Sequence, residues 1–342
     1  MTTRFQSFLG RLAAGETLSA AEAEEAVGVI MEGAASPAQM GAFLMGLAER
    51  GETVAELEGA ARAMRKRVTP VEAPADAIDT CGTGGDGAQT LNVSTAAGLI
   101  VAAAGVPVAK HGNRAQSSRA GSADVLEALG VRIDLSADAV ARSIREVGFG
   151  FMMAPLHHAA MKHVAPVRRE LGFRTLFNLV GPLANPASVR RQLIGVFAPR
   201  WLEPMAEVLR ALGSERAWLV HGDGLDEITT TGETEIVALE EGKIHRFRIS
   251  PESFGIPRAK REDLQGGDAA FNARAIEALF SGASGAYRDI VSLNAAAALV
   301  VAGKVPDLPQ GLSLVLAMLD SGAAARTLGK LIGFTRSAGG SS

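Results

Sequence analysis

The most constraining feature of this sequence is a change in its hydrophobic pattern near residue 77. Beyond that point, short apolar runs of strand length alternate with segments of helical periodicity, which predicts a mainly parallel β-sheet covered by helices. Strands are expected at Ala77–Thr80, Val106–Lys110, Phe149–Ala154, Gln192–Phe197 and Ala217–His221. Helices are expected at Val93–Ala104, Ala123–Leu129, Asp138–Val147 and Leu202–Leu212. Ligands bind beyond the carboxyl ends of such strands, so the loops that follow them are the first places to search for a site.

Residues 1–70 carry helical signals only. Three helix starts have the Ser/Thr-x-x-Glu/Gln pattern of a capping box, namely Ser19–Glu22, Ser36–Gln39 and Thr53–Glu56. We therefore predict a small all-helical domain at 1–70, with a returning segment near 159–186, and a larger α/β domain at 71–342. The amphipathic N-terminal helices carry more apolar surface than one small domain buries, which predicts a homodimer.

Composition limits the partners and the compartment. The 342 residues have a formal net charge of −3, so the chain has no general attraction for nucleic acid. Its most apolar stretches, Ala96–Gly105 and Ala295–Gly303, are shorter than the roughly 20 residues that a bilayer requires, so no membrane partner is expected. A single cysteine, Cys81, and the lack of a signal-peptide pattern predict a cytoplasmic location.

The loop after the first expected strand has the composition of a phosphate-binding loop. Gly82, Gly84 and Gly87 match G-x-G-x-x-G, but the third glycine lies several residues before the helix, unlike in a dinucleotide fold. The chain also lacks a Walker lysine pattern. Glycines free backbone N–H groups to approach an anion, and Asn92, with the hydroxyls that follow it, adds donors at the helix start. Asp86 would repel a pyrophosphate unless a divalent cation lay between them, which predicts magnesium.

The loop after the second expected strand is dense in oxyanion-binding groups. Three cations, two amides and three serines occur within residues 110–122. The right-handed β-α-β crossover places this loop beside the glycine-rich loop. A third loop, at 221–227, brings two adjacent acids to the same sheet edge, where we expect them to face solvent opposite the phosphate site.

The sequence resembles the anthranilate phosphoribosyltransferase family at these loops. The motifs G-T-G-G-D, N-x-S-T and K-H-G-N-R-A-x-S-S-x-x-G-x-A-D occur in order, and the resemblance continues through Val167–Pro186 and His221–Ile228. It departs at Ala120 and Ala159, where the family often has serine and proline. The resemblance implies a nucleoside phosphorylase-like fold whose α/β domain binds phosphoribosyl pyrophosphate. It also implies a homodimer and magnesium-dependent transfer of the phosphoribosyl group to the amine of anthranilate, a step of tryptophan biosynthesis.

The resemblance further implies a role for each matching residue. The pyrophosphate, its metal or the ribose would contact Gly82, Gly85, Asp86, Thr90, Asn92, Ser94 and Thr95. Phosphate oxygens would be held by Lys110, Ser117 and Ser118. Anthranilate would be held by Asn113 and Arg168, with His111 and His158 flanking its path. The other expected substrate-binding positions are Gly112, Arg114, Ala115 and Ser122, and magnesium would be bound by Ser94, Asp226 and Glu227. We assign no general base.

Two alternatives to this function stay open. One is a pyrimidine-nucleoside phosphorylase, which resembles the family in fold and also has a glycine-rich phosphate loop. The other is a binding protein of the same fold that has lost catalysis. Intact acids at 226 and 227, together with Asn113 and Arg168, argue against both. The chain from Gly255 onward carries no chemical motif, so we predict no site residues there.

Overall fold

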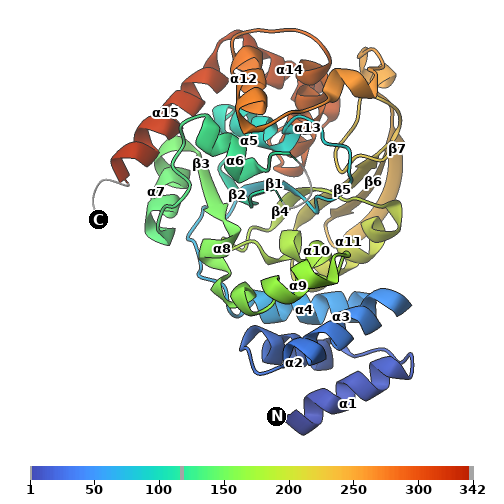
Figure 1. The fold of residues 1–342 in the computed structure, drawn as a ribbon. Coiled ribbons are helices and arrows are strands. Elements are labelled where there is room, and N and C mark those ends of the chain that lie inside the picture. The colour runs from blue at the N-terminus through green and yellow to red at the C-terminus, as the bar shows by residue number, and fades with distance from the viewer. Residues whose placement is uncertain (1, 116–118, 339–342) are drawn as a thin grey trace.

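The computed structural model describes residues 2–115 and 119–338 (Figure 1). Its N-terminal part consists of four helices, α1 (Thr2–Ala13), α2 (Ala20–Met31), α3 (Pro37–Arg50) and α4 (Val54–Arg65). The three capping boxes expected from the sequence are present at α2, α3 and α4. In each, the N-cap hydroxyl and the side chain three residues later satisfy each other's backbone N–H groups, so local sequence fixes where these helices begin.

A seven-stranded sheet occupies the centre of the remaining chain, with strand order β3-β2-β1-β4-β5-β6-β7. The strands are β1 (Ile78–Gly82), β2 (Val108–Gly112), β3 (Phe149–Met153), β4 (Arg191–Gly195), β5 (Arg216–Gly222), β6 (Thr234–Glu240) and β7 (Lys243–Ile249). The first five are parallel and correspond to the five expected strands, which confirms the mainly parallel sheet. The antiparallel strands β6 and β7 were not anticipated. Strand β7 is an exposed edge rich in basic residues, so it lacks a clear apolar run.

Helices cover both faces of this sheet. One face packs against α5 (Val93–Ala103), α6 (Ser122–Ala128), α12 (Ala269–Phe280), α13 (Ala286–Val301), α14 (Leu308–Asp320) and α15 (Ala323–Ala338). The opposite face packs against α11 (Leu202–Ala211), while α7 (Ala137–Val147) covers β3. The short 3₁₀ helices are η1 (Ala159–His163), η2 (Gly181–Ala184), η3 (Pro199–Trp201), η4 (Pro251–Phe254) and η5 (Arg261–Leu264). In Figure 1, α12 to α15 lie above the sheet and α1 to α4 below it.

The segment that follows β3 returns to the N-terminal helices. It contains α8 (Ala154–His157), α9 (Ala165–Leu171) and α10 (Phe177–Val180). Val164 and Leu176 share one buried core with Phe43 of α3, and Arg65 Nε of α4 donates to the Leu183 carbonyl at 2.7 Å. The same core includes Leu219 of β5, so the helical part packs continuously onto the sheet. The division into domains at 1–70 and 71–342 stays a prediction.

The two apolar stretches noted in the sequence form buried helices rather than lipid-facing ones. Ala96 to Ala102 of α5 and Ala295 to Val301 of α13 are enclosed in the core above the sheet. Within residues 2–115 and 119–338, no helix is both long and apolar enough to cross a membrane. Because β1, β2, β4 and β5 run parallel, the loops after them meet at one edge of the sheet.

Candidate active site

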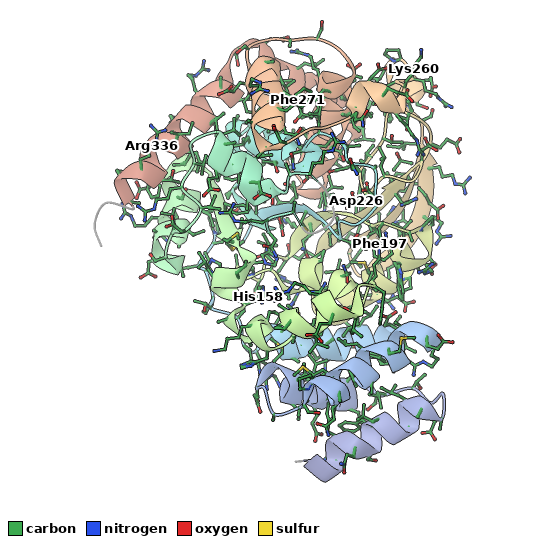
Figure 2. The ribbon with its side chains drawn as sticks, viewed as in Figure 1. His158, Phe197, Asp226, Lys260, Phe271 and Arg336 are labelled. Atoms are coloured by element: carbon green, nitrogen blue, oxygen red, sulfur yellow. The ribbon has the colours of Figure 1, made fainter. Side chains whose placement is uncertain are left out.

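A cavity of ≈ 280 Å³ lies at the carboxyl edge of the sheet, where these loops meet. Its lining includes every described residue expected to bind substrate or metal, apart from His158 and Arg168. Ser117 and Ser118 lie outside the described residues. In the view of Figure 2, Asp226 lies near the middle of the molecule, with Phe197 below it and His158 closer to the N-terminal helices.

The glycine-rich loop connects β1 to α5 through a left-handed backbone. Gly84, Gly85 and Gly87 have φ of 64°, 78° and 78°, values that residues other than glycine rarely adopt. The Gly84 N–H donates to Asp226 Oδ2 at 2.8 Å, and the Gly85 carbonyl accepts from the guanidinium of Arg174. Arg174 also lies over the ring of Phe197, with its Cζ 4.4 Å from the ring centroid. The loop is therefore tied to two distant segments of the chain.

The acidic pair reaches this loop because two strand ends carry glycine. A Cβ at Gly195, the last residue of β4, would lie 1.5 Å from the Asp226 carbonyl oxygen, and a Cβ at Gly82 would lie 2.7 Å from Asp226 Oδ2. Asp226 and Glu227 are half-buried, and Glu227 Oε1 accepts from the Ser94 N–H at 3.2 Å. The two acids are therefore only partly exposed in the solvent-facing loop that was expected, because the glycines let their backbone cross directly over the strand ends.

Three carboxylates meet in this part of the cavity. Burial, and then the nearby Asp86, raises the pKa of Asp226 to about 7. Burial and the charge of Asp226 also raise the pKa of Glu227 well above its usual range, against the opposing effect of Lys110. Half-buried carboxylates that repel one another form a set of oxygen ligands that suits a hard divalent cation. Among the described residues, no three His, Cys, Asp or Glu side chains form a group that could hold a metal ion.

Lys110 lies beneath the cavity rather than projecting into open solvent. Its side chain is 1% exposed, and Nζ donates to the Thr80 carbonyl and to Ser94 Oγ, the latter at 3.2 Å. Burial lowers the pKa of Lys110, while the buried carboxylate of Asp79 opposes that shift. Asp79 itself accepts from Asn185 Nδ2 at 2.7 Å and from the His111 N–H at 3.2 Å. Lys110 lies directly under Ser94. The contact with phosphate that the sequence predicts for Lys110 stays a prediction.

The start of α5 is held by residues from the C-terminal third of the chain. Asn92 Oδ1 accepts from Asn272 Nδ2 at 2.8 Å, and the Asn92 carbonyl accepts from the Tyr287 hydroxyl at 3.1 Å. Asn92 Nδ2 reaches the Ala120 carbonyl at 3.2 Å, which links the two substrate loops. Thr95 is fully buried, and its hydroxyl has no hydrogen-bond partner among the described residues. Neither Asn272 nor Tyr287 belongs to a recognisable motif, so the sequence pattern does not predict these contacts.

The second loop is organised around an aspartate in α6. Asp124 Oδ2 accepts from the N–H groups of Ala115 and Gly121, each at 2.9 Å. Arg114 forms ion pairs with Asp124 at 3.0 Å and with Glu127 at 2.8 Å. Asn113 Oδ1 accepts from the Arg114 N–H at 2.8 Å. The guanidinium of Arg114 is therefore held against α6, and Asp124 fixes the conformation of the loop backbone.

Gly112 and Ser122 meet at the base of the second loop. A Cβ at Gly112 would lie 2.3 Å from Ser122 Oγ, so this position requires glycine. Ser122 Oγ in turn donates to the Asn113 carbonyl at 3.4 Å. The serine therefore stabilises the loop from below, and its expected contact with substrate stays a prediction.

His111 lines the cavity, and His158 packs against His111 outside the lining. The rings of His111 and His158 have centroids 5.0 Å apart. Burial, and then the neighbouring histidines, lowers the pKa of His111 to about 3 and that of His158 to about 4. Nε2 of His111 and both ring nitrogens of His158 have no hydrogen-bond partner within the described part of the chain. The pair is neutral at pH 7 and offers polar ring edges in a buried environment.

Arg168 lies behind the cavity lining and reaches it through Asn178. Its Nη2 donates to Asn178 Oδ1 at 3.1 Å, and Asn178 lines the cavity. Burial lowers the pKa of Arg168, whose guanidinium lies over the ring of Phe177 at 5.8 Å. A partly desolvated guanidinium with a single acceptor retains donors for a carboxylate.

Two family models match the chain. Residues 74–325 match the a/b domain of the glycosyl transferase family, and residues 6–68 match its helical bundle domain. Among characterised sequences, the chain is 58% identical to an anthranilate phosphoribosyltransferase of Rhizobium rhizogenes over 325 residues, which is 95% of this chain and 96% of that protein. It is 57% identical to the one from Parvibaculum lavamentivorans over 334 residues, which is 97% of this chain and 98% of that protein.

Solved structures of the same fold give matching results. Anthranilate phosphoribosyltransferase from Thermus thermophilus superposes with a TM-score of 0.91 at 45% identity, covering 96% of this chain and 99% of that one. The Saccharomyces cerevisiae protein in complex with PRPP and Mg superposes with a TM-score of 0.90 at 26% identity, covering 98% and 99%. The same yeast protein in complex with 4-fluoroanthranilate gives a TM-score of 0.89 at 25% identity, covering 98% and 99%. The matches cover both the helical part and the sheet.

Proposed function

This chain belongs to the anthranilate phosphoribosyltransferase family, and on that premise we propose that it transfers the phosphoribosyl group of phosphoribosyl pyrophosphate to the amine of anthranilate. The products are phosphoribosylanthranilate and pyrophosphate, in tryptophan biosynthesis. The observation that carries the proposal is the convergence of Asp86, Asp226 and Glu227 on a cavity-lining loop whose glycines adopt a left-handed backbone. Such a site suits a metal-bound pyrophosphate better than a lone phosphate ion.

The cradle formed by residues 82–95 would bind the pyrophosphate and its ribose. Ser94, Asp226 and Glu227 would hold magnesium, which when bound neutralises the negative charge that gathers on the departing pyrophosphate. Lys110, buried directly below Ser94, adds a fixed positive charge on the same side. The donors are already held in place by the protein, so little reorganisation is required as charge develops.

Anthranilate would bind on the other side of the cavity. Arg168 is proposed to pair with its carboxylate, and Asn113 to contact it from the second loop. The neutral rings of His111 and His158 would border its path without adding a positive charge that competes with Arg168. An aromatic amine is largely unprotonated at neutral pH, so orientation towards C1 of the ribose replaces a strong general base.

We also propose that the protein acts as a cytoplasmic homodimer formed through its N-terminal helices. Met45 of α3 is 47% exposed on this helical part, in keeping with an apolar surface there. Sedimentation of the full chain tests this statement directly. A monomer at micromolar concentration would contradict it.

The activity is tested by the fluorescence of anthranilate. Loss of signal that requires both phosphoribosyl pyrophosphate and magnesium, and that a chelator stops, is the expected result. Phosphate-dependent cleavage of a pyrimidine nucleoside would instead identify a phosphorylase. Neither reaction would identify a binding protein.

A further inference from the structure

Helix α13 carries a buried asparagine directly before its apolar C-terminal half. Asn294 is fully buried, and it is followed by a run of buried alanine, leucine and valine. Its Oδ1 accepts from the Ile228 N–H at 3.0 Å, and its Nδ2 donates to the Ile228 carbonyl at 2.7 Å. The second Nδ2 hydrogen reaches the Ile290 carbonyl of the same helix at 2.9 Å. The side-chain amide thus pairs with both polar groups of one residue, 66 positions away in the chain.

That residue directly follows the acidic pair. On the preceding side, the loop is closed by two backbone bonds between Gly222 and Leu225, at 3.0 and 2.9 Å. On the following side, the Thr229 N–H donates to Thr234 Oγ1 at 3.0 Å. The side chains of residues 226 and 227 form their bonds to the glycine-rich loop and α5 between these two anchors. Asn294 thus holds the loop at Ile228, between the turn at 222–225 and the bond of Thr229 to Thr234.

Water cannot replace the two hydrogen bonds between Asn294 and Ile228, which we call the clamp. Ile228 is fully buried, so its N–H and carbonyl have no access to water if the amide is removed. The backbone at 228 would then move to find partners, and the carboxylate of Glu227 would move with it. Residues that hold metal ligands by hydrogen bonds commonly affect metal affinity almost as strongly as the ligands do.

We propose that Asn294 is a positioning residue that fixes Asp226 and Glu227 for metal-dependent binding of phosphoribosyl pyrophosphate. The inference rests on the proposed function, since it presumes that this acidic pair serves the metal. It assigns a role in the site to the C-terminal third of the chain, through a residue that touches neither substrate.

The variant Asn294→Asp tests the proposal with little change of shape. It keeps an oxygen for the Ile228 N–H but replaces the Nδ2 group with an oxygen that faces the carbonyls of Ile228 and Ile290. We expect the magnesium concentration that half-saturates binding of phosphoribosyl pyrophosphate to rise roughly 10–100-fold. The measurement is titration calorimetry without anthranilate, so no turnover is needed. In a parallel assay, the Michaelis constant for anthranilate at saturating magnesium should stay within about twofold of wild type.

Ser292→Ala is the matched control. Ser292 is buried two residues earlier in α13, and its hydroxyl has no partner among the described residues. This variant should bind the substrate with the magnesium dependence of wild type. A dependence in Asn294→Asp within twofold of wild type, or an equal change in Ser292→Ala, would overturn the proposal.

Hydrogen exchange on the wild-type protein tests the clamp without any variant. The Ile228 amide should exchange far more slowly than the amide of Gly224 in the exposed turn, and comparable rates would contradict the clamp. If wild type itself does not bind phosphoribosyl pyrophosphate with magnesium, the proposed function fails. If wild type binds and the variant is unchanged, only the role of Asn294 fails.

Discussion

The two sides of the cavity differ in how their polar groups are satisfied. On the phosphate side, Asp226, Glu227 and Lys110 each bond to a neighbouring loop, helix or strand. On the acceptor side, the rings of His111 and His158 leave buried nitrogens without partners in the described structure. The first side carries several charges held by hydrogen bonds, whereas the second combines the buried, neutral rings of His111 and His158 with the one guanidinium of Arg168.

This difference corresponds to the two substrates of the proposed reaction. A pyrophosphate with its metal requires fixed charges whose mutual repulsion is held in check by the protein before the ligand arrives. A flat aromatic amine requires shape and one carboxylate contact, so unpaired ring edges and a half-buried arginine suffice. The comparison predicts that substitutions on the two sides affect different substrates.

Removal of the acidic pair should have the largest effect. Asp226→Asn combined with Glu227→Gln removes the metal ligands and their repulsion together, and turnover should fall by at least about 1000-fold, or roughly 4 kcal/mol of transition-state stabilisation. The variant should unfold at a temperature equal to or above that of wild type, because two half-buried like charges are gone. Steady-state rates in saturating magnesium measure this. Near-normal rates would contradict the metal role.

Replacement of Lys110 should affect folding as well as binding. Lys110→Ala leaves the fully buried Asp79 without its nearby cation, and a buried charge that loses its partner costs about 3 kcal/mol of unfolding free energy. Urea denaturation measures the loss, and the double variant with Asp79→Asn should recover part of it. Full stability of Lys110→Ala would show that the charge of Lys110 does not stabilise the buried Asp79.

Replacement of Arg168 should affect the acceptor side alone. Arg168→Ala should raise the Michaelis constant for anthranilate at least about tenfold, since a hydrogen bond to a charged group contributes roughly 1.5–3 kcal/mol. Arg168→Lys should fall between alanine and wild type, because an ammonium lacks the planar two-bond match. The exposed neighbour Arg169 provides the control variant Arg169→Ala. Equal losses with anthranilate and with aniline would make Arg168 a structural residue.

The pH dependence of stability gives the smallest effect. His158 has a pKa of about 4 in the folded protein, below its value of roughly 6.5 in an unfolded chain. The unfolded state therefore binds the proton first as pH falls, and the unfolding free energy should drop by about 1 kcal/mol between about pH 7 and pH 5.5. His158→Phe should flatten this slope, whereas His245→Gln on the exposed strand β7 should not. An unchanged slope in His158→Phe would show that His158 is not held neutral.

The sequence was informative where function depends on local composition. Glycines that permit a left-handed backbone, and hydroxyls at the start of α5, are visible in a short window around Gly84 and Ser94. The capping boxes of α2 to α4 are equally local. Together with strand periodicity, these signals were enough to predict the parallel sheet and the loops that line the cavity.

Long-range contacts explain what the sequence did not reveal. Tyr287 and Asn272 reach Asn92 from 195 and 180 positions away, and no periodic pattern encodes such a pairing. The half-burial of Asp226 depends on Gly195, a glycine at the end of a different strand. Lys110 and Asp79, on adjacent strands, are buried together. Each of these features arises from packing between segments that the sequence places far apart.

The separation of the two sides is tested most directly by titrating phosphoribosyl pyrophosphate into two variants at fixed magnesium. Arg168→Ala should bind it with a dissociation constant within about twofold of wild type, because Arg168 lies on the acceptor side. The paired variant Asp226→Asn, Glu227→Gln should lose the magnesium-dependent part of binding. Equal losses in both variants would contradict the account of a braced phosphate side and an independent acceptor side.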